Sequence, residues 1–198
     1  MCRQTLENLA RTDWGRRPVH IQLDRKTSAD RLQNILDTGY LALAHGLQTE
    51  AAWLLFLEDD LDFDIHLWHN IAAWWPFQSG RITLVSLYNP GVRSVFTDPR
   101  NGCFEAHPHY IYGSHALLLA RCTAEFILTH WGEAPAPLDI RISRLAARLQ
   151  RPLYYHVPSL VQHVGQQSVW GGKCHAAVDF DPCWQAENSP KQIQSGVL

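Results

Sequence analysis

The sequence lacks any cysteine pattern that would build a disulfide framework or hold zinc. Its cysteines number five, which is odd, and no two of them are spaced as CxxC. Disulfide-stabilised folds and structural zinc sites carry their cysteines in pairs at characteristic spacings. The sequence therefore gives no reason to predict a disulfide framework or a structural zinc site.

Long apolar runs and blocks of like charge are missing as well. A bilayer-spanning helix needs about 20 consecutive apolar residues, and the longest apolar runs here are far shorter. The N-terminal stretch MCRQTLENLARTDWG has no apolar core of a secretory signal. The net charge is −2, with no basic stretch that would attract a polyanion. We therefore expect a cytoplasmic protein with no transmembrane segment, and we expect no nucleic acid partner.

What the chain does have is enough apolar sequence for one folded domain. Apolar residues make up 46 % of the 198 residues, and charged residues make up 18 %. This composition is typical of globular proteins and not of disordered ones. From about residue 175 the sequence is polar and has no clear period. We therefore predict a single domain over residues 1–174 and a C-terminal tail over residues 175–198.

Apolar periodicity predicts helices alternating with strands. Helices are expected over residues 4–10, 28–47, 62–76, 123–131 and 138–150, and strands over residues 18–23, 53–57, 82–87, 116–120 and 152–157. The segment WLLFL at 53–57 is apolar throughout, as in a parallel-sheet strand that is buried on both faces. This order predicts an α/β fold with a mostly parallel central sheet flanked by helices.

Carboxylates follow two of the predicted strands. In open α/β sheets, ligands bind beyond the carboxyl ends of the strands, which points to Asp24 and to the run Glu58, Asp59 and Asp60. Adjacent carboxylates repel one another unless a cation offsets their charge, and Mg²⁺ and Mn²⁺ prefer oxygen ligands. We expect the acidic run to lie at the end of a central strand and to face an open cleft. The alternative is a solvated acidic turn.

Four segments of the chain resemble motifs that occur in the same order in one enzyme family. They are WLLFLEDDLDF at 53–63, GSHALLL at 113–119, PLDI at 137–140 and PSLVQHVG at 158–165. The first resembles the DxD-type metal motif of GT-A glycosyltransferases, in the EDDL form of N-acetylglucosaminyltransferases and related bacterial enzymes. The other three resemble the acceptor-side strand, the helix that carries the general base and the closing segment of that family. The resemblance covers roughly residues 4–172.

The resemblance implies a GT-A (Rossmann-like) single domain and a metal-dependent transfer of a sugar from a nucleotide-sugar donor, such as a UDP-sugar. By this resemblance Asp60 contacts the metal, which is Mn²⁺ or Mg²⁺, and His163 approaches the metal or the diphosphate. Glu58 and Asp59 contact the ribose or sugar of the donor, and Asp24 contacts its base or ribose. Asp24 has the alternative of capping a turn, and His163 that of a buried structural histidine.

The acceptor implied by the resemblance is a hydroxyl of a glycan, lipid or protein. Gly113 and Ser114 line the acceptor side, and Asp139 deprotonates the acceptor hydroxyl if the reaction inverts the sugar carbon. A retaining enzyme would not need this base. Asp139 also has a structural alternative, because an acidic residue favours the start of a helix. Gly113 has the structural alternative of allowing a tight entry into the strand that follows.

Two further functions compete with glycosyl transfer. The family has a strand before the segment that TLENLARTDW at 5–14 resembles, and this chain begins immediately before that segment. A truncated, non-catalytic glycosyltransferase-like binding module is therefore the main alternative. A metal-dependent phosphohydrolase is a third function, but the sequence lacks the motifs of the haloacid-dehalogenase kind.

Overall fold

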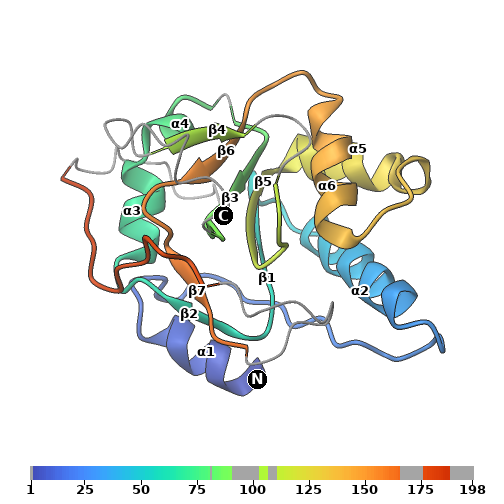
Figure 1. The fold of residues 1–198 in the computed structure, drawn as a ribbon, viewed down its shortest axis with the longest axis horizontal. Coiled ribbons are helices and arrows are strands. Elements are labelled where there is room, and N and C mark those ends of the chain that lie inside the picture. The colour runs from blue at the N-terminus through green and yellow to red at the C-terminus, as the bar shows by residue number, and fades with distance from the viewer. Residues whose placement is uncertain (1, 81, 91–102, 107–110, 166–175, 188–198) are drawn as a thin grey trace.

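The computed structural model describes residues 2–80, 82–90, 103–106, 111–165 and 176–187 (Figure 1). Its helices are α1 (Cys2–Ala10), α2 (Arg31–Gly46), α3 (Leu67–Ala73), α4 (Trp75–Gln78), α5 (Arg121–Thr129), α6 (Leu138–Ala147) and the 3₁₀ turn η3 (Trp131–Glu133). Its strands are β1 (Trp53–Leu57), β2 (Leu61–Phe63), β3 (Leu84–Ser86), β4 (Cys103–Ala106), β5 (Ala116–Ala120), β6 (Leu153–His156) and β7 (Val161–His163). The predicted α/β class is confirmed. None of the described helices is long and apolar enough to cross a membrane.

The main sheet has five strands in the order β1-β5-β3-β6-β4. β5 runs antiparallel to both β1 and β3, and β4 runs antiparallel to β6. Among the described strands only β3 and β6 are parallel neighbours. The prediction of a mostly parallel sheet is therefore wrong. It rests on the alternation of helices with strands and on apolar runs, which indicate that a strand is covered on both faces but do not report the direction of its neighbour.

The strand before the acidic run lies at the edge of this sheet. Within the described part of the chain, β1 has β5 as its strand neighbour on one side and no strand on the other. Every residue of β1 is half-buried, whereas every residue of β5 is buried. The expectation that the carboxylates of residues 58–60 follow a central strand is therefore wrong. Helices above and below a strand can bury an apolar run whether or not the strand has two neighbours.

Two other predicted elements differ from the structure. Residues 18–23 form no strand, and Val19, Ile21 and Leu23 are all exposed. An alternating pattern forms a strand only where a neighbour satisfies its backbone groups, and no described strand pairs with this segment. The helix predicted at 62–76 is divided among β2, α3 and α4. It is broken before Pro76, which fits the first turn of α4 but not a helix interior.

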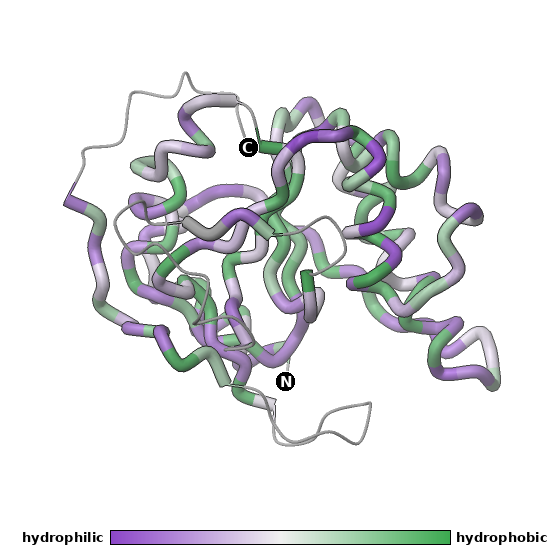
Figure 2. The backbone as a smooth tube through the Cα atoms, turned by 45° about the horizontal axis from the view of Figure 1, so that its top comes forward, coloured by the Kyte–Doolittle hydropathy of each residue, from purple (hydrophilic) through white to green (hydrophobic). Residues whose placement is uncertain are grey.

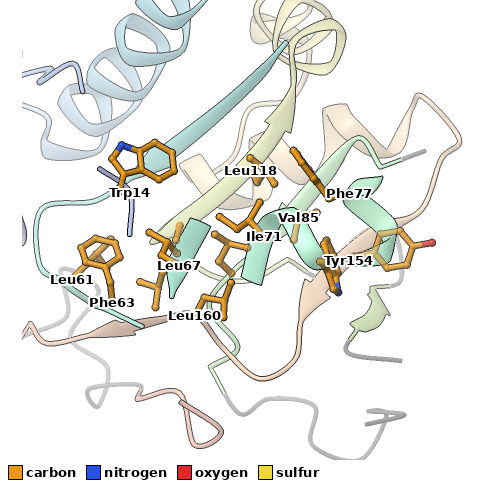
Figure 3. Close-up of a cluster of buried hydrophobic side chains, with 14 of the residues drawn as sticks. Trp14, Leu61, Phe63, Leu67, Ile71, Phe77, Val85, Leu118, Tyr154 and Leu160 are labelled. Carbon is orange, nitrogen blue, oxygen red and sulfur yellow. The ribbon is translucent and has the colours of Figure 1, made fainter. Parts of the chain in front are cut away.

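Helices cover both faces of the sheet. Figure 1 shows α2, α5 and α6 on one side and α3 and α4 on the other, and hydrophobic stretches alternate with hydrophilic ones along these helices in Figure 2. The side chains of β5 point to the two sides in turn. Leu117 and Leu119 join the core beneath α2, α5 and α6, while Leu118 joins Ile71 and Phe77 in the core beneath α3 and α4 (Figure 3).

A second sheet and a C-terminal segment complete the fold. β2 pairs antiparallel with β7. The backbone of Ala177 exchanges two hydrogen bonds with the side chain of Gln162, and the Asn70 amide bonds the backbone of Trp184 and Ala186. The described part of the predicted tail, residues 176–187, is therefore anchored to the core by β7 and α3.

A fully buried histidine lies where this C-terminal segment meets the main sheet. The ring of His156 lies 5.0 Å from that of Trp74 and 5.7 Å from that of Trp184. Its Nδ1 donates to the carbonyl of Pro158 at 2.6 Å, because a carbonyl can only accept. Its Nε2 is buried without a hydrogen-bond partner among the described residues. Burial lowers the pKa of His156 from 6.5 to about 4, so this imidazole is neutral in the folded protein.

We expect His156 to make the folded state sensitive to acid. Between about pH 6.5 and pH 4, His156 is protonated in the unfolded chain but neutral in the folded protein. The contribution of neutral His156 to stability is therefore complete above this pH range and is lost as the pH falls through it. At about 1.4 kcal/mol per pH unit, the wild type should lose about 2 kcal/mol relative to His156→Gln between pH 7 and pH 5. Urea unfolding at both pH values measures this difference.

Glu58 and Asp64 also change their contributions to stability over this pH range, but in the opposite direction to His156. Burial raises the pKa of Glu58 to about 7 and that of Asp64 to about 6, so their contributions to stability decline as the pH rises. Both groups are present in the wild type and in the variant, so their effects cancel in the comparison. A stability difference that does not change with pH would mean that His156 is not held neutral by the fold.

Candidate functional site

Backbone hydrogen bonds bring three segments together beside the end of β1. The amide of Glu58 donates to the carbonyl of His115 at 2.9 Å, which places the segment before β5 next to the acidic run. β2 runs antiparallel to β7, and the amide of Val164 donates to the carbonyl of Asp60 at 2.9 Å. The acidic run, the segment that leads into β5 and the end of β7 therefore meet at one place.

Asp60 and His163 form a side-chain pair at this meeting point. His163 Nε2 lies 3.0 Å from Asp60 Oδ2, and the two side chains are 9 % and 19 % exposed, respectively. An ionised carboxylate only accepts, so Nε2 carries the proton of this hydrogen bond. The second oxygen, Asp60 Oδ1, is buried and has no hydrogen-bond partner among the described residues. An unpaired carboxylate oxygen is costly to bury, and a bound cation would offset that cost.

Glu58 is held by two neighbours from the segment before β5. The Ser114 hydroxyl donates to its Oε1, and His115 Nε2 lies 3.7 Å from its Oε2. The pKa of Glu58 is raised to about 7, mainly by burial; the Ser114 hydrogen bond and His163 lower it, and the carboxylates of Asp60 and Asp139 add to the rise. These mutual effects mean that the three acidic side chains and His163 share one electrostatic environment.

Asp139 joins the site from the first turn of α6. Its Oδ2 accepts a hydrogen bond of 2.9 Å from the amide of Gly113, and its Oδ1 accepts one of 2.8 Å from the amide of Ile140. Gly113 has a φ of 81°, and a side chain here would collide with the ring of His115. A glycine therefore serves two purposes, because it adopts the left-handed backbone and leaves room for the imidazole.

The remaining predicted residues are not joined to this cluster by any contact among the described residues. Asp59 is exposed on the turn between β1 and β2. Asp24 is exposed as well, and its Oδ1 accepts a hydrogen bond of 2.7 Å from the amide of Lys26. This is the local turn that the sequence offered as the alternative for Asp24. Their donor-binding roles remain predictions.

Sequence reasoning assigned no role to His115 or Tyr88. The two rings lie 4.5 Å apart, and His115 lies 4.6 Å from the ring of His163. His115 directly follows Gly113 and Ser114, and this position next to two predicted site residues was the feature of the sequence that could have indicated a role for it. Tyr88 comes from the end of β3, and no local pattern connects it to the acidic run.

The residues present suit a metal ion that is shared with a ligand. Within the described ranges, no three His, Cys, Asp or Glu side chains are arranged to hold an ion by themselves. Mg²⁺-type ions are commonly bound through one or two carboxylates together with substrate phosphates, and not inside an all-protein cage. Asp60, with one oxygen buried and unpaired, fits the protein side of such a shared site.

We expect Gly165→Ala to separate Asp60 from His163. A Cβ atom at Gly165 would collide with Oδ2 of Asp60 and with Nε2 of His163, and both side chains can move aside only by giving up their hydrogen bond. The loss should be about 1–2 kcal/mol in the free energy of unfolding. The matched control is Gly132→Ala, because nothing lies within 4 Å of a Cβ there, and its effect should stay within about 0.5 kcal/mol. Equal effects in urea unfolding would contradict the tight packing.

The sequence comparisons do not assign this chain to a family. No protein-family profile matches it, and no curated protein is similar to it. An open apolar groove between α1 and residues 21–23 is lined by none of the site residues described above.

Proposed function

We propose that this chain is a metal-dependent glycosyltransferase of the GT-A type, which moves a sugar from a nucleotide-sugar donor to an acceptor hydroxyl. One observation carries the proposal. The Asp60–His163 pair leaves a buried carboxylate oxygen unpaired and lies in the same electrostatic environment as two more carboxylates. A cation that bridges these carboxylates to an anionic donor would supply the positive charge that the cluster lacks.

The donor side of the proposed site belongs to the acidic run and β7. Asp60 is the residue that would hold Mn²⁺ or Mg²⁺, and the ion would stabilise the charge on the departing nucleotide diphosphate. His163, which donates its Nε2 proton to Asp60, would orient that carboxylate and approach the metal or the diphosphate. Glu58 and Asp59 would bind the donor's sugar or ribose, and Asp24 its base or ribose. A UDP-sugar is the proposed donor, in a cytoplasmic protein.

The acceptor side of the proposed site belongs to β5 and α6. Asp139 would take the proton from the attacking hydroxyl of a glycan, lipid or protein acceptor, as an inverting mechanism requires. Its hydrogen bond to the Gly113 amide fixes one carboxylate oxygen and so orients the group. Gly113 and Ser114 would line the space for the acceptor, and Ser114 also holds Glu58 in place.

A non-catalytic binding module is the second candidate, and the edge position of β1 favours it. The residues of β1, which lead into the proposed donor side, are half-buried, whereas those of β5, which follow the proposed acceptor side, are buried. Such a protein would bind a nucleotide without turning over a nucleotide-sugar.

Thermal unfolding with UDP tests whether the protein binds a nucleotide, as both candidate functions require. We expect UDP with Mn²⁺ to raise the melting temperature, and UDP with EDTA or Mn²⁺ alone to leave it unchanged, since a ligand stabilises the state that it binds. Release of UDP from UDP-glucose, UDP-galactose and their N-acetyl derivatives then separates an enzyme from a binding module. Equal shifts with and without metal, or no shift with UDP, GDP or CMP, would contradict the proposal.

A further inference from the structure

His115 lies between the groups of the proposed site without a role of its own. Its ring lies 4.5 Å from that of Tyr88 and 4.6 Å from that of His163, at 60° to the latter. Its Nε2 lies 3.7 Å from Oε2 of Glu58, and its side chain is 18 % exposed. The imidazole is therefore a packed element of the site and not a surface side chain.

A glycine lies against each of the two imidazoles, Gly113 against His115 and Gly165 against His163. A Cβ at Gly113 would collide with Nδ1 and Cε1 of His115, and a Cβ at Gly165 would collide with Nε2 of His163. Each ring thus lies directly against the backbone, with the other ring at 4.6 Å. Any other residue at either glycine would push a ring out of this arrangement.

The ring that packs against His115 is also the one that bonds Asp60. His163 reaches Asp60 Oδ2 through Nε2 alone, so a rotation of its ring about the side-chain bonds would break the contact. The ring of His115 occupies one side of His163 and opposes such a rotation. Partners that orient a ligating group commonly change metal affinity about 10–100-fold when they are mutated.

We infer that His115 is a positioning residue, whose ring holds the His163 imidazole in its hydrogen bond with Asp60. The inference rests on the proposed function for the identity of the ligand, but not for the contact itself. His115 acts through His163 and has no contact with the reacting groups in this assignment. Its ring, and not its ability to carry a proton, is the feature that matters.

Three variants of His115 test the role of the ring. His115→Phe keeps a planar ring against His163 and Tyr88, whereas His115→Ala and His115→Gln remove it, and the glutamine fills much of the same space. His130→Phe and His130→Ala are the matched controls, because His130 also contacts an aromatic ring, that of Phe126 at 4.3 Å, and a carboxylate, that of Glu133 at 2.8 Å. His130 makes these contacts at the surface, between α5 and η3.

The first measurement needs no nucleotide. The Nε2 proton of His163, assigned by its absence in His163→Gln, is followed by ¹⁵N NMR of the free protein. We expect the signal to be retained in His115→Phe and in both controls, and to broaden through solvent exchange in His115→Ala and His115→Gln. A wild-type signal in both ringless variants would overturn the inference, whatever the protein binds.

The second measurement is calorimetry with UDP and Mn²⁺. The ringless variants should bind UDP about 10–100-fold more weakly than the wild type, and His115→Phe should bind within about threefold of it. Wild-type affinity in the ringless variants would also overturn the inference. If the wild type itself binds no UDP, the proposed function fails, and the NMR result still decides the role of His115.

Discussion

Asp60→Asn is expected to abolish metal-dependent nucleotide binding. The amide keeps the shape of the carboxylate but removes the charge that a divalent cation requires. At a UDP concentration of about 100 times the dissociation constant, the wild type should gain about 2.7 kcal/mol of stability in the presence of Mn²⁺, and the variant should gain nothing measurable. Thermal or urea unfolding with and without UDP and Mn²⁺ measures the gain.

Asp62→Asn is the matched control for this substitution. Asp62 lies on β2, two residues from Asp60, and its Oδ1 contacts the amide of the next residue, Phe63. Among the contacts between described residues, none joins its side chain to His163 or Glu58, so its amide variant should bind UDP and Mn²⁺ as the wild type does. If the Asp60 variant retains the metal-dependent gain, or if both variants lose it, Asp60 is not the residue that holds the ion.

Asp139→Asn is expected to cut sugar transfer about 10²-fold or more, since general base catalysis contributes about 10²–10⁴-fold. The amide oxygen can still accept from the Gly113 amide, so the variant keeps that contact and loses its basicity together with the local hydrogen bond from the Ile140 amide. Binding of UDP with Mn²⁺ should change little. Turnover of the donor that reacts in the UDP-release assay, measured alongside calorimetry, separates the two effects.

Asp30→Asn is the control for an acidic residue at the start of a helix. Asp30 caps α2 by accepting from the Leu32 amide at 2.9 Å, and asparagine caps helices about as well. This variant should transfer sugar normally. Normal transfer by Asp139→Asn as well would point to a retaining mechanism or to a purely structural Asp139. Failure of Asp139→Asn to fold would favour the structural role.

The edge position of β1 bears directly on these experiments. The acidic run follows a strand that has one described neighbour, and residues 18–23, which the sequence predicts to be a strand, form none. The proposed donor site is thus built on a less constrained part of the sheet than the proposed acceptor site. The two substitutions test these two parts separately, because Asp60 belongs to the proposed donor side and Asp139 to the proposed acceptor side.

Much of the secondary structure could be read from local patterns. The apolar runs at 53–57 and 116–120 form β1 and β5, and the strand predicted at 152–157 forms β6. These predictions succeed because burial on both faces leaves a continuous apolar signature in the sequence. The strand predicted at 18–23 fails because its alternating pattern has no partner, and a partner is not a local property.

The sequence by itself determined that an apolar strand ends in Glu58, Asp59 and Asp60, and its resemblance to a family assigned His163 and Asp139 to the same site. Only the tertiary structure decided how these groups meet. The antiparallel pairing of β2 with β7 sets His163 against Asp60, and the pairing of β1 with β5 sets His115 beside Glu58. Strand direction and register depend on which partners are available across long stretches of chain, so no local pattern of residues could specify them.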